Sequence, residues 1–298
     1  FDVDTDYNFK DREVLVYGGV AAEMSASFDI FWDSKVAAEI AHLRDIAPLI
    51  VAGNGSPASV FKPSERLLPL LEDIVNNQLM HALFVNTAIQ VDSIEYFYDL
   101  PHGSEIENVA HENITKRLHN VLASARDSVV IQSPYLVLSK RSRNLFKHLR
   151  EDRPDIELLF STNSLAATDA FSAYSLTHKH KKHYIKTLGF DVYEFQPYPV
   201  DVGKFLPRLP QLTVEKRQGI NSGKIPAVGP NPSLKKPIPR TGLHAKSFVV
   251  DGHVSMVGSH NLDPRGEGFN TENGIIIYDK VFAQVLERSI RMDIEPGN

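Results

Sequence analysis

The sequence predicts an α/β fold in which helices cover both faces of a central sheet. Residues 114–195 alternate between apolar residues at helical spacing and short runs rich in Val, Ile and Phe, which is the order of consecutive βαβ units. Residues 247–257 contain two short apolar strands around Asp251-Gly252, a dipeptide typical of hairpin turns. Residues 281–290 have the apolar spacing of a closing helix. Together these segments predict a layered α/β/α domain whose sheet is mixed and mainly parallel.

The elements expected along the chain follow from local periodicity and from helix breakers. An acidic loop is expected at residues 2–11, a strand at 14–17, and a helix at 21–34 that directs Phe28 and Trp32 inward. Further on, the sequence predicts helices at 111–125 and 141–150 and strands at 129–131, 156–160 and 191–195. Residues 198–240 show no clear periodicity and contain eight Pro, so we expect a long irregular segment there.

Composition limits the protein classes that the chain can belong to. With 298 residues, of which 42% are hydrophobic, it can bury one large core or two smaller ones, and we expect a division into residues 1–110 and 111–298. No apolar run is long enough to span a membrane, and the lack of Cys excludes disulfides and thiolate metal sites. The net charge of −5 disfavours a general nucleic-acid binder, although residues 201–240 carry eight Lys or Arg against two acidic residues.

A group of polar residues at fixed spacing lies near the C-terminus. His244, Lys246 and Asp251 stand in the pattern HxKxxxxD, and Ser259 and Asn261 follow in the pattern GSxN. Because side chains on a strand alternate, His244 and Lys246 share one face, and the hairpin returns Ser259 and Asn261 beside them. Lys offers a point charge, Ser and Asn offer neutral donors, and His can exchange a proton near neutral pH. The group therefore suits a phosphate; the alternative is an ordinary hairpin with polar side chains on its surface.

A carboxylate downstream of this group is a candidate partner for its histidine. Glu272 lies in the segment NTENGIIIY, and we expect it to hold the second ring nitrogen of His244 and fix the tautomer. Residues 9–20 align with residues 270–281 at a constant offset of 261, which pairs Asp11 with Glu272. By this repeat, Asp11 orients a second histidine, expected upstream of Phe1. The alternative is a chance similarity between two strand and helix units.

The pattern HxKxxxxD, followed by GSxN and a downstream Glu, resembles the signature of the phospholipase D superfamily. The segments SHNLDPR at 259–265 and NTE at 270–272 are most similar to its cardiolipin synthase and bacterial phospholipase D branch. The resemblance implies a half-domain packed against a second half about a pseudo-twofold axis, with no metal and no cofactor. Because the sequence contains one complete motif, we expect the end of a first half followed by a complete second half. The first motif would then belong to an N-terminal half on the same or a separate polypeptide.

The resemblance also implies a phosphodiester displacement in two steps. The histidine of the first motif attacks phosphorus and forms a phosphohistidine, while His244 acts as the general acid and then as the general base. Lys246, Ser259 and Asn261 stabilise charge on the phosphoryl oxygens. Asp251 supports the strand turn and takes no part in proton transfer.

Polar residues at two strand ends are candidates for substrate binding. Ser133-Pro134-Tyr135 resembles the SPY segment that opens the second half of cardiolipin synthase relatives, and Asn163 lies in a segment that resembles their TNS. Ligands of α/β layers bind at the carboxyl ends of the strands. We therefore expect Ser133, Tyr135 and Asn163 near the substrate, with Tyr135 either lining a lipid pocket or packing as a buried structural residue.

The cardiolipin synthase resemblance favours a phospholipid substrate, with hydrolysis and phosphatidyl transfer both open. The basic residues in 201–240 could form a lid or a peripheral contact with an anionic membrane, or belong to a solvated insertion. The run from His178 to His183 is interpreted as a solvated basic face, because its lysines would repel a metal ion. The expected localisation is bacterial: peripheral to the inner membrane, cytoplasmic, or secreted as an effector. Two alternatives stay open, a nuclease and an inactive half that binds anionic lipid.

Overall fold

The computed structural model describes residues 4, 6–51, 75, 77–101, 114–222 and 238–297. The chain forms two compact units, a larger one of residues 1–14, 91–99 and 111–298 and a smaller one of residues 15–90 and 100–110. The expected division after residue 110 coincides with one boundary of these units. Residues 1–14 and 91–99 nevertheless belong to the larger unit, because each of these segments pairs with a strand from the C-terminal part of the chain.

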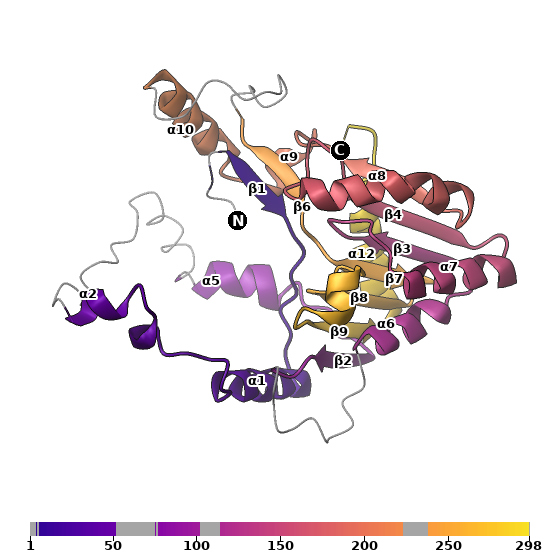
Figure 1. The fold of residues 1–298 in the computed structure, drawn as a ribbon, viewed down its shortest axis with the longest axis horizontal. Coiled ribbons are helices and arrows are strands. Elements are labelled where there is room, and N and C mark those ends of the chain that lie inside the picture. Colours follow the sequence, from indigo (N-terminus) through magenta and orange to yellow (C-terminus); the bar gives the residue numbers. More distant parts are fainter. Residues whose placement is uncertain are drawn as a thin grey trace. The chain divides into compact units, whose positions relative to one another are not determined.

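A mixed sheet forms the centre of the larger unit (Figure 1). Its strands lie in the order β2 (Ser93–Tyr98), β9 (Asn273–Tyr278), β8 (Val254–Gly258), β7 (Ser247–Val250), β3 (Ser128–Gln132), β4 (Glu157–Asn163) and β5 (Asp191–Phe195). The neighbours β3, β4 and β5 are parallel, as expected for βαβ units, and the other neighbours are antiparallel. The sheet is therefore mixed, as expected, but the prediction that it is mainly parallel is wrong, because its parallel part is confined to residues 128–195.

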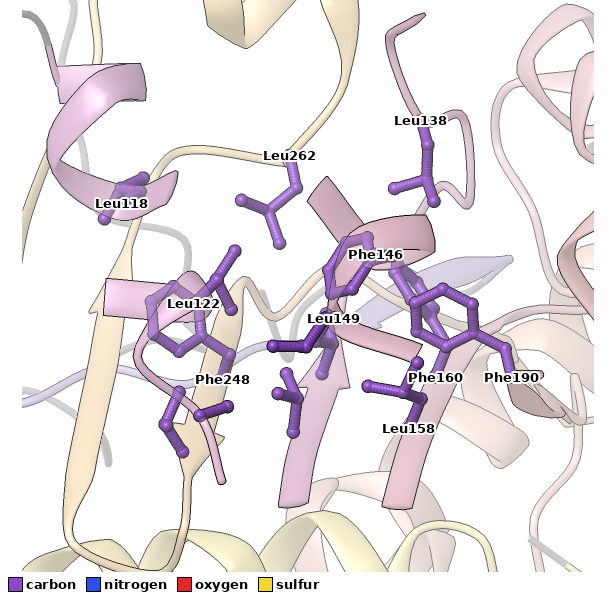
Figure 2. Close-up of a cluster of buried hydrophobic side chains, with 14 of the residues drawn as sticks. Leu118, Leu122, Leu138, Phe146, Leu149, Leu158, Phe160, Phe190, Phe248 and Leu262 are labelled. Atoms are coloured by element: carbon purple, nitrogen blue, oxygen red, sulfur yellow. The ribbon is translucent and has the colours of Figure 1, made fainter. Parts of the chain in front are cut away.

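Helices cover both faces of this sheet and make the α/β/α layers. On one face α6 (Ile114–Ala123), α7 (Lys140–Asp152) and α8 (Phe171–Lys186) contribute to a large apolar cluster, and α12 (Lys280–Met292) covers the other face. Strand residues divide by alternation: Val129 and Ile131 of β3 belong to the first cluster, and Val130 belongs to the second. Figure 2 shows Phe146 of α7 gathered with strand residues such as Phe248. The predicted layered fold is confirmed.

The hairpin predicted at residues 247–257 is present as β7 and β8. Asp251 and Gly252 have φ angles of 51° and 60°, in the left-handed region that Gly and Asp tolerate better than most residues. The turn returns β8 beside β7, with Ser247 opposite Val257. Because His244 precedes β7 and Ser259 follows β8, this hairpin brings both ends of the motif to the same edge of the sheet.

A second, two-stranded parallel sheet joins β1 (Tyr7–Lys10) to β6 (Arg240–Leu243). The Tyr7 side chain of β1 packs directly against Gly242 of β6, where a Cβ would overlap with the Tyr7 hydroxyl. The strand predicted at residues 14–17 is wrong, because residues 11–17 form no strand. The strand forms earlier in the sequence, where the backbone of β6 offers hydrogen-bond partners.

Among its described residues, the smaller unit contains one longer helix, α1 (Gly19–Trp32). The shorter helices described there are η1 (Ile40–His42), α2 (Ala47–Val51), α5 (Asn77–Met80) and the π-helix η3 (His81–Val85). α1 confirms the predicted helix, but the predicted burial of Phe28 and Trp32 is wrong. Their exposed fractions are 61% and 70%, and their rings stack on one another with centroids 5.7 Å apart. Local periodicity identified the helix but not which face is covered.

The segment predicted as irregular begins with two helices, α9 (Val202–Phe205) and α10 (Leu209–Asn221). Within α10, Lys216 is buried and its Nζ donates to Asp6 Oδ1 at 2.8 Å, so this cation is no part of a basic surface. Residues 223–237 of the predicted loop lie outside the described residues. Among the described helices, none combines the length and the apolar composition that a bilayer span requires.

Candidate active site

The parallel pairing of β1 with β6 brings Asp11 to His244. Lys10 lies opposite Leu243 in this register, so the next residues of the two segments, Asp11 and His244, also lie side by side. The Lys10 carbonyl accepts the His244 backbone N–H at 2.8 Å, and the Asp11 Oδ2 lies 2.7 Å from His244 Nδ1. Residues 233 positions apart in the sequence therefore form one hydrogen-bonded pair.

The predicted partner of His244 was Glu272, and this prediction is wrong because Asp11 holds the ring. Glu272 is buried and accepts hydrogen bonds from Asn270 Nδ2 at 2.9 Å and from Ser259 Oγ. The antiparallel register of β8 and β9 explains this, since it places the residues that follow β8 beside those that precede β9. The repeat therefore assigned each carboxylate to the histidine of its own half, whereas the structure joins Asp11 to the histidine at 244.

The environment of Asp11 keeps its carboxylate ionised. Burial raises the pKa of Asp11, but the hydrogen bonds from His244 and from the Arg12 N–H, at 3.0 Å, outweigh this effect and leave the pKa below its ordinary value. An ionised Asp11 accepts a hydrogen bond from the N–H at His244 Nδ1 and thereby fixes the tautomer. The other ring nitrogen, Nε2, is then the atom that can exchange a proton with a bound substrate.

Lys246 lies two residues after His244 in the short connection between β6 and β7 and is 8% exposed. Its Nζ donates to the His244 carbonyl, which ties the ammonium group to the backbone of His244. Burial lowers the pKa of Lys246 to about 8, although the carboxylates of Asp11 and Glu272 oppose this shift. The lysine is therefore still a cation near neutral pH, and it loses its charge at a lower pH than an ordinary lysine.

We expect turnover to fall as the pH rises through about 8, because Lys246 then loses the charge that stabilises a phosphoryl oxygen. Between about pH 8 and the ordinary value of 10.5, the unfolded chain binds a proton that the folded chain has lost, so the destabilising effect of burying Lys246 shrinks as the pH rises and unfolding does not explain the fall in turnover. A pH profile of kcat/KM measures the effect. Lys246→Arg keeps its charge over this range, so an unchanged alkaline limb in that variant would contradict the assignment.

The GSxN residues lie at the same edge of the sheet. Ser259 accepts the Asn273 N–H on its Oγ at 2.9 Å and also contacts Glu272. The Asn261 backbone carbonyl accepts a hydrogen bond from Ser133 Oγ at 2.9 Å. The Asn261 Oδ1 is buried and has no hydrogen-bond partner among the described residues. Its amide therefore has a polar atom that can serve a bound group.

Two of the three expected substrate-binding residues serve the backbone instead. Asn163 is 2% exposed; its Nδ2 donates to the Leu243 carbonyl and its Oδ1 accepts the Leu243 N–H, both at 2.7 Å. Ser133 is buried and holds the Asn261 carbonyl. Both are corrections: these side chains fix the residues around His244 because buried strand ends leave backbone groups that need partners. Tyr135 is partly exposed, and its hydroxyl donates to Asp169 Oδ1 at 3.0 Å.

Asp251 acts at a distance from this group of side chains. Its carboxylate accepts the backbone N–H groups of Arg126, Asp127 and Ser128, each at 2.8 Å. These residues connect α6 to β3, so Asp251 fastens the hairpin turn to the neighbouring strand. The third residue of the HxKxxxxD pattern therefore supports the fold, and its contacts are all with backbone groups.

Sequence reasoning missed Asp169, the partner of the Tyr135 hydroxyl. Asp169 is exposed in the connection between β4 and α8. Burial raises the pKa of Tyr135 most, and the charge of Asp169 raises it further. The same charge opposes the lowering of the pKa of Lys246. It lies five residues after the end of the TNS segment, in a stretch without periodicity, so no local signal marked it. Among the described residues, no three His, Asp or Glu side chains converge in an arrangement that would hold a metal ion.

Residues 211–294 match a family model described as "Cardiolipin synthase, PLD-like domain". An uncharacterized protein of Helicobacter pylori (strain J99) is 26% identical over 297 residues, which cover 98% of this chain and 52% of that protein. Cardiolipin synthase C of Escherichia coli (strain K12) is 25% identical over 291 residues, which cover 94% of this chain and 54% of the synthase. The chain thus spans about half the length of the curated relatives that it matches.

Solved structures similar to the chain include Nuc and NucT. Nuc from Salmonella typhimurium, a phospholipase D family member, gives a TM-score of 0.40 at 14% identity, and the alignment covers 69% of this chain and 96% of the Nuc chain. NucT from Helicobacter pylori gives a TM-score of 0.43 at 12% identity and covers 68% and 96%. The family model covers the motif from His244 to Glu272, and a cardiolipin synthase aligns with nearly the whole chain. The family model and the alignment with a cardiolipin synthase support membership of the phospholipase D superfamily.

Proposed function

We propose that the chain supplies one histidine motif of a phospholipase D-type enzyme, which cleaves or transfers phosphodiesters of phospholipids through a phosphohistidine intermediate. The observation that carries this proposal is the hydrogen bond between His244 Nδ1 and the ionised Asp11. It leaves the imidazole poised to donate and accept a proton at Nε2. Lys246 and Asn261 lie at the same edge of the sheet, where a phosphoryl group needs a cation and a neutral partner.

The reaction has two displacements at phosphorus. In the first, the lone pair of an imidazole nitrogen of the first motif's histidine forms a bond to phosphorus, and the bond to the leaving alcohol oxygen breaks. His244 Nε2 gives its proton to that oxygen. In the second, water or an acceptor alcohol attacks phosphorus, His244 takes the proton of the attacking oxygen, and the phosphorus–nitrogen bond breaks. The proton given in the first step is thus recovered in the second.

The structure leads us to revise the role of Glu272 within this mechanism. Since Asp11 already holds His244, we assign Glu272 to the nucleophilic histidine of the other motif, in line with the correspondence of Asp11 and Glu272 at an offset of 261. Glu272 is buried and held by Ser259 and Asn270, so its carboxylate is fixed before a partner arrives. The 298 residues contain one complete motif, so the nucleophile comes from another half or a second copy of the chain.

A phospholipid is favoured over nucleic acid as the substrate. The matching family model is that of a cardiolipin synthase, and the chain carries a net charge of −5, whereas nucleic-acid binding depends on neutralising many phosphates with Lys and Arg. The buried Lys216, paired with the exposed carboxylate of Asp6, removes one further cation from the surface of the basic segment. We also propose a peripheral contact with the membrane surface, because the lipid substrate resides there.

The substrate assignment is tested by incubating the purified chain in parallel with phosphatidylglycerol micelles and with single-stranded DNA at equal phosphodiester concentration. Mass spectrometry of the lipids separates phosphatidic acid, the product of hydrolysis, from cardiolipin, the product of transfer. Native mass spectrometry of the same sample shows which assembly is active. We expect turnover of the lipid only. Cleavage of DNA alone would replace this assignment with a nuclease, and vesicle binding without turnover, even when a half that carries the other motif is supplied, would indicate a lipid-binding protein.

A further inference from the structure

The tripeptide Lys10-Asp11-Arg12 is anchored on the side opposite His244. Asp11 faces the histidine, while its neighbours both contact Asp293, which lies just after α12. Lys10 Nζ lies 2.5 Å from Asp293 Oδ1, and Arg12 Nη2 lies 2.8 Å from Asp293 Oδ2. Side chains of successive residues in an extended segment point to opposite sides. The two contacts to Asp293 therefore direct the Asp11 carboxylate toward His244.

Asp293 is itself fixed in the core of the larger unit. It is 3% exposed, and its Oδ2 also accepts a hydrogen bond from Gln132 Nε2 of β3 at 2.9 Å. Its carboxylate thus joins the central sheet, the end of α12 and the segment that carries Asp11. Lys10 is held further by the ring of Phe205, whose centroid lies 4.2 Å from Nζ.

Besides these polar contacts, Val14 packs against the apolar cluster that α12 covers. A groove of about 560 Å³ runs along residues 9–14, with Phe205, Val257, Phe282 and Leu286 among its walls. β1 ends at Lys10, and residues 11–17 have no strand partner. Beyond Lys10 the place of the backbone therefore depends on side-chain anchors, and Asp293 provides two of them.

We propose that Asp293 is a positioning residue that holds Asp11, and through Asp11 the imidazole of His244, in the geometry of the reaction. The proposal rests on the proposed function in one respect, that His244 exchanges protons with a substrate. Neutralising Asp293 leaves the Arg12 guanidinium without a carboxylate partner among the described ion pairs, and it removes the shorter of the two contacts of Lys10. A buried cation without a partner draws its segment toward water, and a misplacement of about 1 Å at a catalytic group can cost roughly a hundredfold in rate.

The test compares Asp293→Asn with Asp279→Asn, which removes a carboxylate from the other end of the same helix. Asp279 is the N-cap of α12, accepts the Phe282 N–H at 2.7 Å and touches no residue of the Asp11 segment in the described hydrogen bonds. Both variants are measured by circular dichroism, by kcat and KM, and by ¹⁵N NMR of the His244 ring, which reports the tautomer. We expect Asp293→Asn to lower kcat by about tenfold to a hundredfold with little change in KM, and to reduce the protonated fraction of Nδ1. Asp279→Asn should leave both unchanged.

The NMR signal separates this inference from the proposed function, because the tautomer is observed without turnover. An altered tautomer in a chain without phosphodiesterase activity would support Asp293 and reject the function. A folded Asp293→Asn variant with the wild-type tautomer and kcat would overturn the inference. If that variant does not fold, Arg12→Met provides the decision, because it keeps Asp293 paired with Lys10 and removes one anchor. An unchanged tautomer in Arg12→Met would then overturn the inference as well.

Discussion

His244→Ala is expected to lower kcat/KM for a phospholipid by about 10² to 10⁴-fold, the range that a general acid and base contributes. The variant loses both the proton given to the leaving oxygen and the base that activates water. Its fold should stay intact, because the side chain is 35% exposed and its removal opens no closed cavity in the core. Steady-state kinetics and a thermal unfolding curve measure the two effects on the same sample.

The matched control is His178→Ala, which removes an exposed histidine on α8. It should keep wild-type turnover and stability, since His178 lies in a solvated basic face. Substantial activity in a folded His244→Ala variant would reject the assignment of His244. A loss of stability in that variant, with the activity falling in proportion, would show a structural role instead.

Asp251→Ala is expected to lower the free energy of unfolding by about 1 to 3 kcal/mol, because three backbone N–H groups, two exposed and one partly buried, lose a charged acceptor. The replacement also places Ala at a φ of 51°, a conformation that Asp and Asn tolerate better. Asp251→Asn keeps an acceptor oxygen and the tolerance for this φ, so it should cost less. Urea unfolding of the three proteins gives the comparison.

Asp155→Ala, which removes an exposed carboxylate beside β4, should leave the unfolding midpoint unchanged. At urea concentrations well below their unfolding midpoints, the Asp251 variants should keep their turnover, because Asp251 binds the connection of α6 to β3 and not the reacting group. Wild-type stability of Asp251→Ala would contradict its structural role. A stable but inactive Asp251→Asn variant would instead place Asp251 in the chemistry.

Local patterns predicted the elements whose partners are near in the sequence. The hairpin of β7 and β8 and the strand β5 were predicted from alternation and turn residues, and α12 from its helical spacing. The strand expected at residues 14–17 failed because strand formation depends on a partner, and the available partner, β6, pairs with residues 7–10. Nothing within the first twenty residues contains that information.

Single residues of the candidate site could be predicted, but not which of them contact one another. His244, Lys246, Ser259 and Asn261 could be recognised because their spacing is local. The pairing of Asp11 with His244 could not, since it is set by the parallel register of two strands 233 residues apart. Asn163 illustrates a different limit: a polar residue at a strand end has the same sequence signal whether it binds a ligand or holds a neighbouring backbone, and here it holds Leu243.

The leaving-group dependence of His244→Ala tests the central claim most directly. Two phosphodiesters are compared in the first turnover. One releases an alkyl alcohol, and the other releases p-nitrophenolate, which departs without needing a proton. If His244 Nε2 protonates the leaving oxygen, the variant should slow the alkyl diester by at least about a hundredfold and the nitrophenyl diester by less than about tenfold. An equal loss for both substrates would contradict the role of His244 as the general acid.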